Sequence, residues 1–189
     1  HAFDRFEKNS SKDKETITIF GNGSLGFIMA NVLKYKLPNS KIVVVGRNLE
    51  KLKMFSFVDH VYSSDDIPTD FYTNHAFECA GGPGSEDAIN SIIKYIKPQG
   101  SVMLMGVSEN KVAINTRDIL EKGLTLIGCS RSGRKDFIEA VKMLENKKIQ
   151  NRFKTIVFED DEIKNVDDIH RFFKNDLNTP FKTVAKWNI

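Results

Sequence analysis

The stretch TITIFGNGSLG, residues 16–26, decides the fold. The β-branched run Thr16–Phe20 is typical of a strand, and residues 24–35 carry apolar side chains at helical spacing. Between them, GNGSLG at residues 21–26 matches the pattern G-x-G-x-x-G. That pattern alone is weak evidence. Its position directly after a strand and at the start of a helix makes a dinucleotide-binding turn the favoured interpretation.

The three glycines have different expected roles in such a turn. Gly21 would permit the tight turn, Gly23 would let a diphosphate approach the backbone, and Gly26 would let the helix pack closely on the strand. The N–H groups at the helix start, at Ser24 and Leu25, and the positive end of the helix dipole would then bind the pyrophosphate. The alternative is a glycine-rich turn that binds no ligand.

Outward from this stretch, apolar strands and amphipathic helices alternate. Strands are expected at Thr16–Phe20, 41–45, 58–62, 74–79, 101–105 and 124–128, and helices at 24–35, 48–54, 85–96, 116–122 and 135–145. Ser85 is expected to cap its helix, and residues 98–100 (Pro-Gln-Gly) are expected to form a turn. The pattern predicts an α/β fold, a Rossmann doubly wound parallel sheet of about six strands.

The chain divides into three parts by composition and rhythm. The polar composition of residues 1–14 indicates a linker or the tail of a preceding helix. Residues 15–146 are expected to form the dinucleotide-binding domain. In residues 147–189 we expect a strand at 153–158, a helix at 167–173 and a strand at 181–187. This β-α-β tail is too small for a domain of its own, so it is expected to belong to a catalytic domain that is otherwise missing. The start at His1, without Met, favours a fragment or a processed chain.

The end of the second strand is the next test of a dinucleotide site. A carboxylate there would bind the adenosine ribose hydroxyls, but this chain has Gly46, Arg47 and Asn48 instead. Arg47 is suited to pair with a 2′-phosphate, Asn48 can add a hydrogen bond, and Lys51 can add charge. The sequence therefore favours NADP(H) over NAD(H) as the cofactor. The alternative is that Arg47 is a solvated surface residue.

Loops that follow later strands supply further candidates, because ligands bind at the carboxyl ends of parallel strands. The first group would line the cofactor towards its nicotinamide, and the second would hold a phosphate of cofactor or substrate. The candidates are Ala80, Gly81 and Val107 in the first group, and Ser130 and Arg131 in the second. The alternatives are ordinary turns for the first group, and a helix capped by Ser132 beside solvated arginines for the second.

Composition and residue spacing exclude several classes of function. The 28 Lys and Arg against 25 Asp and Glu give a net charge of +3, too mild to indicate a nucleic-acid partner. No apolar run reaches the roughly 18 residues of a membrane span. Cys79 and Cys129 are too few for a disulfide framework and fit a reducing, cytoplasmic compartment, and we expect both to be inert. No histidine is spaced as part of a metal set, so no metal ligand and no catalytic residue is predicted here.

Five motifs together carry a resemblance to a known family. GNGSLG, VVVGRN, FECAGG, IKPQGSVMLMGV and KGLTLIGCSRSGRKDF occur in this order over residues 15–146. In this order they resemble the coenzyme domain of medium-chain dehydrogenase/reductases. The tail is similar too, because in that family the chain returns to finish the catalytic domain with a final strand like FKTVAKW.

The resemblance implies an activity and partners for a longer parent protein. Gly46-Arg47, GCSRSGRKDF and the terminal KTVAKWNI most resemble members that reduce a phosphorylated pentulose for CDP-ribitol, which serves bacterial teichoic acids and capsules. The implied reaction is NADPH-dependent reduction of ribulose 5-phosphate to ribitol 5-phosphate. The family's catalytic zinc would lie in the missing domain only. Family members usually dimerise through an edge of the sheet, and Lys111–Asn115 is the expected edge strand here. Another polyol or alcohol dehydrogenase, or a dinucleotide-sensing module without redox chemistry, remains open.

Overall fold

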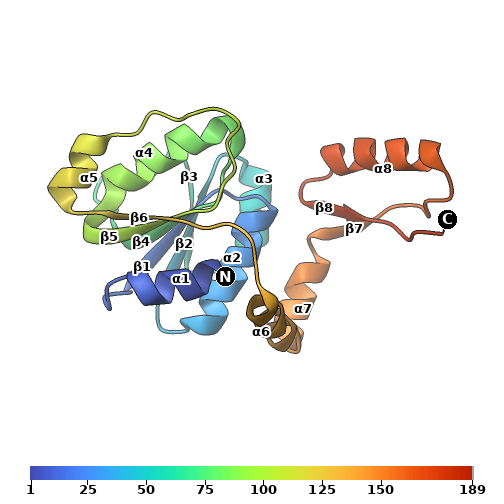
Figure 1. Cartoon of the computed structure of the whole chain (residues 1–189), viewed down its shortest axis with the longest axis horizontal. Coiled ribbons are helices and arrows are strands. Elements are labelled where there is room, and N and C mark those ends of the chain that lie inside the picture. The colour runs from blue at the N-terminus through green and yellow to red at the C-terminus, as the bar shows by residue number, and fades with distance from the viewer. Residues whose placement is uncertain (189) are drawn as a thin grey trace. The chain divides into compact units, whose positions relative to one another are not determined.

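The computed structural model describes residues 1–188 and contains a six-stranded sheet (Figure 1). Its strands are β1 (Thr16–Phe20), β2 (Lys41–Gly46), β3 (His60–Ser63), β4 (Thr73–Glu78), β5 (Ile96–Leu104) and β6 (Thr125–Gly128). They lie in the order β3-β2-β1-β4-β5-β6, and every neighbouring pair is parallel. The predicted Rossmann sheet is confirmed, and the strand order reverses between β1 and β4.

Helices alternate with these strands. They are α1 (Ala2–Asn9), α2 (Ser24–Lys36), α3 (Leu49–Leu52), α4 (Ser85–Tyr95), α5 (Thr116–Lys122) and α6 (Arg134–Leu144), with short 3-10 turns η1 (Lys53–Phe55) and η2 (Gly82–Gly84). The chain separates into two compact units, one of residues 1–140 and one that starts at Val141. No helix within residues 1–188 is long and apolar enough to cross a membrane.

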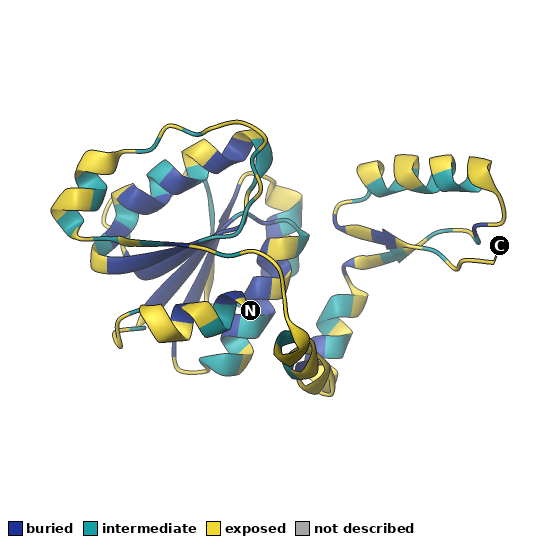
Figure 2. Cartoon of the chain, viewed as in Figure 1, coloured by how far each residue is buried: buried dark blue, intermediate teal, exposed yellow. Residues whose placement is uncertain are grey.

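The centre of the sheet is buried on both faces (Figure 2). Every residue of β1 and of β4 is buried, and so is all of β2 except Lys41. Burial on both faces explains why these strands are nearly continuous apolar or β-branched runs rather than alternating ones. On one face α4 packs over the sheet, and the buried cluster there consists of Phe20, Val45, Ala76, Ile92, Ile96 and Val102.

Helix α1 belongs to this first unit and is not a linker. The ring of Phe6 has no exposed surface, and its centroid lies 5.1 Å from the rings of both His75 and Phe77 on β4. The linker expected at residues 1–14 is therefore wrong for residues 2–9, where the alternative of a helix holds. The buried ring of Phe6 thus packs α1 on the sheet.

Two boundaries in the first half of the unit differ from expectation. Strand β3 begins at His60 rather than Val58, because the Val58 N–H donates to the Phe55 carbonyl at 3.1 Å and closes a turn. Ser85 does not cap α4: it is the first helical residue and its side chain is buried, while the N-cap position is Gly84.

Strand β5 begins five residues earlier than expected, at Ile96 rather than Ser101. The Pro-Gln-Gly segment lies inside it as an irregularity, where Gln99 adopts φ +62°. The pairing of β5 with β4 shifts register between Thr73 and His75 at this point. The turn expected at residues 98–100 is therefore wrong, because these residues lie inside β5, where the shift in register marks an irregularity.

The expected edge strand Lys111–Asn115 is wrong, because this segment is a loop. Side chains of α4 satisfy its backbone. The Ala113 N–H donates to Glu86 Oε2 and the Asn115 N–H donates to Asn90 Oδ1, each at 2.9 Å, while Asn90 Nδ2 donates to the Ala113 carbonyl. Three of its backbone groups are thus bonded to α4, and the sequence argument, which assumed an unpaired edge strand at this position, does not hold.

The second unit contains two short parallel strands joined through a helix. Its elements are α7 (Lys147–Lys154), β7 (Val157–Glu159), α8 (Val166–Asn178) and β8 (Lys182–Val184). The expected β-α-β order is confirmed, with a longer helix and shorter strands. An isolated bridge between Ile163 and Trp187 extends the pairing beyond β8.

The strand expected at 153–158 is wrong in its first half. Residues up to Lys154 belong to α7, which Asn146 caps through its Oδ1, the acceptor of the Lys148 N–H at 3.0 Å. The N-cap starts a helix that the apolar and β-branched residues from Phe153 onward do not reveal.

His75 illustrates how a polar residue is accommodated in the sheet. The imidazole has no exposed surface, and its Nδ1 accepts the Ser101 N–H at 3.0 Å. Burial is the main cause that lowers the pKa of His75 below its ordinary value of 6.5. The neutral ring is thus part of the pairing between β4 and β5.

We expect His75 to make stability depend on pH below neutrality. Below about pH 6.5 the unfolded chain binds a proton that the folded chain excludes. The free energy of unfolding therefore decreases as the pH is lowered, by at most about 1.4 kcal/mol per pH unit. Urea denaturation between about pH 7.5 and 5 should show this slope, and His75→Gln should flatten it. His60→Gln, which removes an exposed imidazole, should leave the slope unchanged. Equal slopes for wild type and His75→Gln would contradict the assignment.

Candidate functional site

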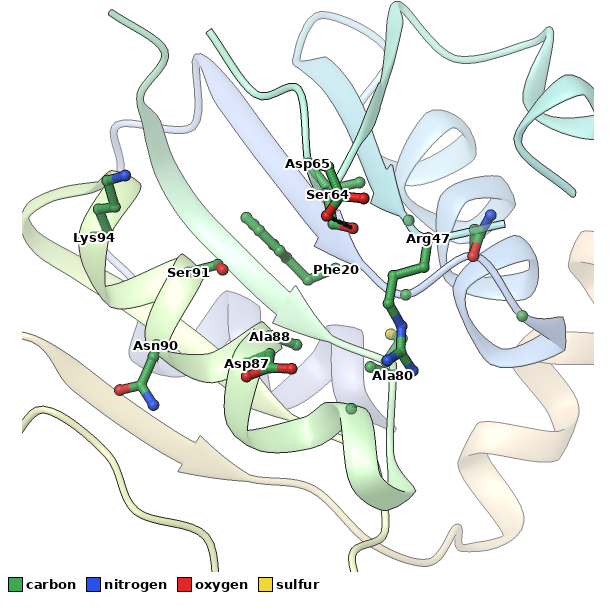
Figure 3. A pocket seen from close by; sticks show the side chains of 17 residues that line it. Phe20, Arg47, Ser64, Asp65, Ala80, Asp87, Ala88, Asn90, Ser91 and Lys94 are labelled. Carbon is green, nitrogen blue, oxygen red and sulfur yellow. Dashed lines mark hydrogen bonds between the residues drawn. The ribbon is translucent and has the colours of Figure 1, made fainter. Parts of the chain in front are cut away.

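A cleft of about 590 Å³ opens at the carboxyl ends of β1, β2 and β4 (Figure 3). It lies where the strand order reverses, which is where open parallel sheets bind ligands. The lining residues are Phe20, Gly21, Asn22, Gly23, Val45, Gly46, Arg47, Ser64, Asp65, Cys79, Ala80, Gly84, Asp87, Ala88, Asn90, Ser91 and Lys94.

The glycine loop forms one wall of the cleft, and two of its glycines leave no room for a side chain. Gly21 has φ +121°, and a Cβ there would lie 2.5 Å from the Ala80 nitrogen. A Cβ on Gly26 would overlap the Gly21 carbonyl and lie 3.5 Å from the side chain of Ile19. The expected roles of both residues, a tight turn and close packing of helix on strand, are confirmed.

Helix α2 points its N-terminus into this loop. Its N-cap is Gly23, and no side chain in the described part of the chain caps it. Beside Gly23, the space where a Cβ would stand has no atom within 4 Å from the described residues other than Gly23 and its chain neighbours. The start of the helix therefore offers N–H groups and a positive dipole end next to open space, an arrangement that suits an anion.

Arg47 crosses the cleft from the turn after β2. Its guanidinium extends over Gly84, where a Cβ would lie 2.6 Å from Nη2 (Figure 3). Asn48 beside it caps α3, because its Oδ1 accepts the Lys51 N–H at 3.0 Å. The turn therefore presents one cation over the cleft and begins a short helix on its outer side.

The sequence reasoning missed the opposite wall. Asp87, Asn90, Ser91 and Lys94 come from one face of α4, and Ser64 and Asp65 follow the end of β3 (Figure 3). The spacing of 87, 90, 91 and 94 is helical and marks a polar face opposite the apolar stripe, a signal that was available. That this face borders the cleft depends on how α4 lies on the sheet, which the spacing does not give.

The side chain of Glu78 binds the loop after β4 to the loop after β5. Its side chain has no exposed surface; Oε1 accepts the N–H groups of Ala80 and Gly81, each at 2.9 Å, and Oε2 accepts that of Gly106 at 2.8 Å. A further bond runs from the Gly82 N–H to the Val107 carbonyl at 2.7 Å. The loops after β4 and β5 are thus fixed to each other by a buried carboxylate.

The candidate residues from the sequence divide into those that line the cleft and those that do not. Gly21, Gly23, Gly46, Arg47 and Ala80 are among the lining residues. Not among them are Ser24, Leu25, Gly26, Asn48, Lys51, Gly81, Val107, Ser130 and Arg131. Of these, Gly81 and Val107 are joined to the cleft through the Glu78 loops, whereas Ser130 and Arg131 are exposed beyond β6.

Neither cysteine has the character of a nucleophile. Burial, and secondarily the charge of Glu78, raises the pKa of the Cys79 thiol far above its usual range. Burial also raises the pKa of Cys129. Within residues 1–188, no three His, Cys, Asp or Glu side chains come together as a possible metal site.

Comparison with known sequences gives the family. The sequence profile of the zinc-binding dehydrogenases matches residues 24–146, from the start of α2 to just beyond α6. The chain belongs to the zinc-binding dehydrogenase family. The lining residues from Val45 to Lys94 lie within the matched part, whereas Phe20, Gly21, Asn22 and Gly23 come just before it.

Individual relatives in this family are similar over the whole chain. A ribulose-5-phosphate reductase of Streptococcus pneumoniae is 51% identical over 189 residues, all of this chain and 55% of that protein. Ribulose-5-phosphate reductase 1 of Staphylococcus aureus is 48% identical over 99% of this chain and 55% of its own length. A crystal structure of S. aureus TarJ in complex with NADPH has 47% identity and a TM-score of 0.94, over 100% of this chain and 60% of that one. The chain thus spans little more than half of these relatives.

We expect Glu78→Gln to weaken the cleft through its loops. An amide in place of the carboxylate turns one acceptor into a donor and removes the charge, so at least one of the hydrogen bonds from Ala80, Gly81 and Gly106 is lost and the others are weakened. The free energy of unfolding should fall by about 1–3 kcal/mol, measured by urea denaturation at neutral pH. Glu50→Gln, on an exposed ion pair with Lys53, is the matched control and should change stability by less than about 0.5 kcal/mol. Equal stability of the two variants would show that the three hydrogen bonds to Glu78 are not important for the fold.

Proposed function

We propose that residues 15–146 bind NADP(H) in the cleft at the ends of β1, β2 and β4. The observation that carries this is the meeting of two groups: the uncapped N-terminus of α2 beside the open space at Gly23, and the guanidinium of Arg47 over the cleft. The first suits the pyrophosphate, and the second suits an additional phosphate on the adenosine ribose. The NADPH complex of S. aureus TarJ supports the same cofactor.

The choice of NADP(H) over NAD(H) rests on Arg47. The end of β2 carries no carboxylate to accept hydrogen bonds from a free ribose 2′-hydroxyl, whereas a guanidinium binds a phosphate with two parallel hydrogen bonds. Asn48 and Lys51 flank this position. The Oδ1 of Asn48 is already the cap of α3, so its amide group is the part proposed to face the cofactor.

For the whole parent protein we propose reduction of D-ribulose 5-phosphate to D-ribitol 5-phosphate. The bound cofactor supplies the hydride, which adds to the C2 carbonyl carbon, and a proton completes the alcohol. The relatives at 51% and 48% identity, both ribulose-5-phosphate reductases, support this substrate. This chain spans 55% of them, so the substrate site belongs to the proposal for the parent and is not assigned to residues here. A role in teichoic acid synthesis, and a cytoplasmic location, are part of the same proposal.

No zinc chemistry is assigned to this chain. The described residues offer no group of ligands that fits the metal, so a catalytic zinc would require residues outside them. The part played by residues 1–188 is to hold the cofactor, with the loops fixed by Glu78 forming the floor towards the nicotinamide end.

Residues 147–189 are proposed to belong to the catalytic domain of the parent. Helix α8 supports this, because Val166, Phe173 and Leu177 are 61–86% exposed and lie along one stripe of the helix. An apolar stripe of this kind is normally covered by another part of the protein. A homodimer also remains a proposal, and the segment Lys111–Asn115 is a loop, not a strand, in this structure.

We expect calorimetric titration of this chain to show tighter binding of NADPH than of NADH. Arg47→Ala should weaken NADPH binding about 10- to 100-fold, because a hydrogen-bonded charge pair with the 2′-phosphate is worth roughly 1.5–3 kcal/mol, and should leave NADH binding unchanged. The control is Arg117→Ala, which removes an exposed arginine from α5. Equal affinity for the two cofactors would favour another polyol dehydrogenase. Binding of neither would contradict the proposal.

A further inference from the structure

Asn22, the second residue of the glycine loop, connects two loops of the cleft. Its side chain is buried, with 8% of its surface exposed, and Nδ2 donates to the Asn48 carbonyl at 2.6 Å. The bond runs from the loop between β1 and α2 to the turn between β2 and α3. It therefore joins the wall proposed for the pyrophosphate to the turn that carries Arg47.

Gly46 makes room for this side chain. A Cβ at position 46 would lie 2.5 Å from Asn22 Oδ1 and 2.6 Å from Asn22 Cβ, so the amide group lies directly against the Gly46 backbone. Asn22 thus touches the residues on both sides of Arg47: it packs on Gly46 and donates a hydrogen bond to Asn48. The backbone of Arg47 is held between these two contacts.

The remaining bonds of the turn do not depend on Asn22. The Gly21 N–H donates to the Val45 carbonyl at 2.8 Å, the Ser64 N–H to the Gly46 carbonyl at 3.0 Å, and the Leu52 N–H to the Asn48 carbonyl at 3.1 Å. The end of β2 and the start of α3 are therefore held by these backbone bonds and by the Asn48 cap, without Asn22. The Asn22 side chain adds contacts to the backbone on both sides of Arg47, at Gly46 and Asn48.

We propose that Asn22 is a positioning residue that sets the preference for 2′-phosphorylated adenine dinucleotides. It holds the turn of residues 46–48 so that the Arg47 guanidinium stands over the cleft, as seen in Figure 3. Asn22 acts through Arg47 and carries no charge that could bind the phosphate by itself. This inference rests on the proposed binding of NADP(H).

The test is a double-mutant cycle on this chain, with NADPH and NADH titrated calorimetrically into wild type, Asn22→Ala, Arg47→Ala and the double variant. Asn22→Ala should weaken NADPH binding about 3- to 10-fold, the loss expected for one hydrogen bond, and change NADH binding less than 2-fold. In the Arg47→Ala background, Asn22→Ala should cause no further change in the ratio of the two dissociation constants.

Two further variants complete the test, one that disrupts the same contact and one that serves as a control. Gly46→Ala disrupts the same contact between Asn22 and Gly46, because the new methyl group would displace the Asn22 amide. This variant should show the same selective loss of NADPH affinity as Asn22→Ala. Asn146→Ala is the matched control, since it removes the cap of α7 and no residue of the cleft, and should leave the ratio unchanged. Thermal unfolding of each variant establishes that it is folded.

The outcomes separate this inference from the function on which it rests. A selective loss in Asn22→Ala that disappears in the Arg47→Ala background supports the inference. Equal weakening of NADPH and NADH in Asn22→Ala, or an additional selective loss in the double variant, overturns it and leaves the proposed function intact. A wild-type chain that does not prefer NADPH overturns both.

Discussion

The close approach of three strand ends at Gly21 is the constraint on which the rest of the cleft depends. Its N–H binds the end of β2 at Val45, and its Cα lies so near the backbone of Cys79 and Ala80 that a Cβ would come within 2.6 Å of three backbone atoms. Any larger residue would push β1 and β4 apart, and these strands are buried along their whole length. The floor of the cleft and the core of the sheet are thus one packed structure, and the start of α2 and the Arg47 turn are both placed by it.

The sheet could be predicted from the sequence because its strands are buried on both faces. Such strands have an apolar run and glycine boundaries, and their number and alternation with helices leave few topologies. The second unit was predicted less well, because residues 153–158 are mostly apolar or β-branched, as in a strand, whereas the N-cap at Asn146 starts α7, which includes the first two of them. Lys111–Asn115 also contains apolar and β-branched residues, but its hydrogen-bond partners are side chains of α4, more than 20 residues away.

The half of the cleft that follows a local motif was predictable, and the half that depends on tertiary neighbours was not. The glycine loop and Arg47 are recognised by their distance from a strand end. Asn22 and Glu78 have partners that lie 26 and 28 residues further along the chain for the bonds to Asn48 and Gly106. Only the order of strands shows that these segments are adjacent. A buried carboxylate such as that of Glu78, at the end of β4, needs hydrogen-bond partners, and its three N–H partners are part of the explanation for its presence.

The contact between Asn22 and Gly46 has a consequence for how cofactor preference can change. The contact involves the backbone on either side of position 47 and not the side chain of residue 47. That side chain can therefore be replaced without changing the contact between Asn22 and Gly46. A carboxylate at position 47 would be held over the same cleft, and a single codon would then be enough to change the charge that meets the ribose. Positions 22 and 46, by contrast, are sterically coupled, because a Cβ at position 46 would lie 2.5 Å from Asn22 Oδ1 and require that side chain to move.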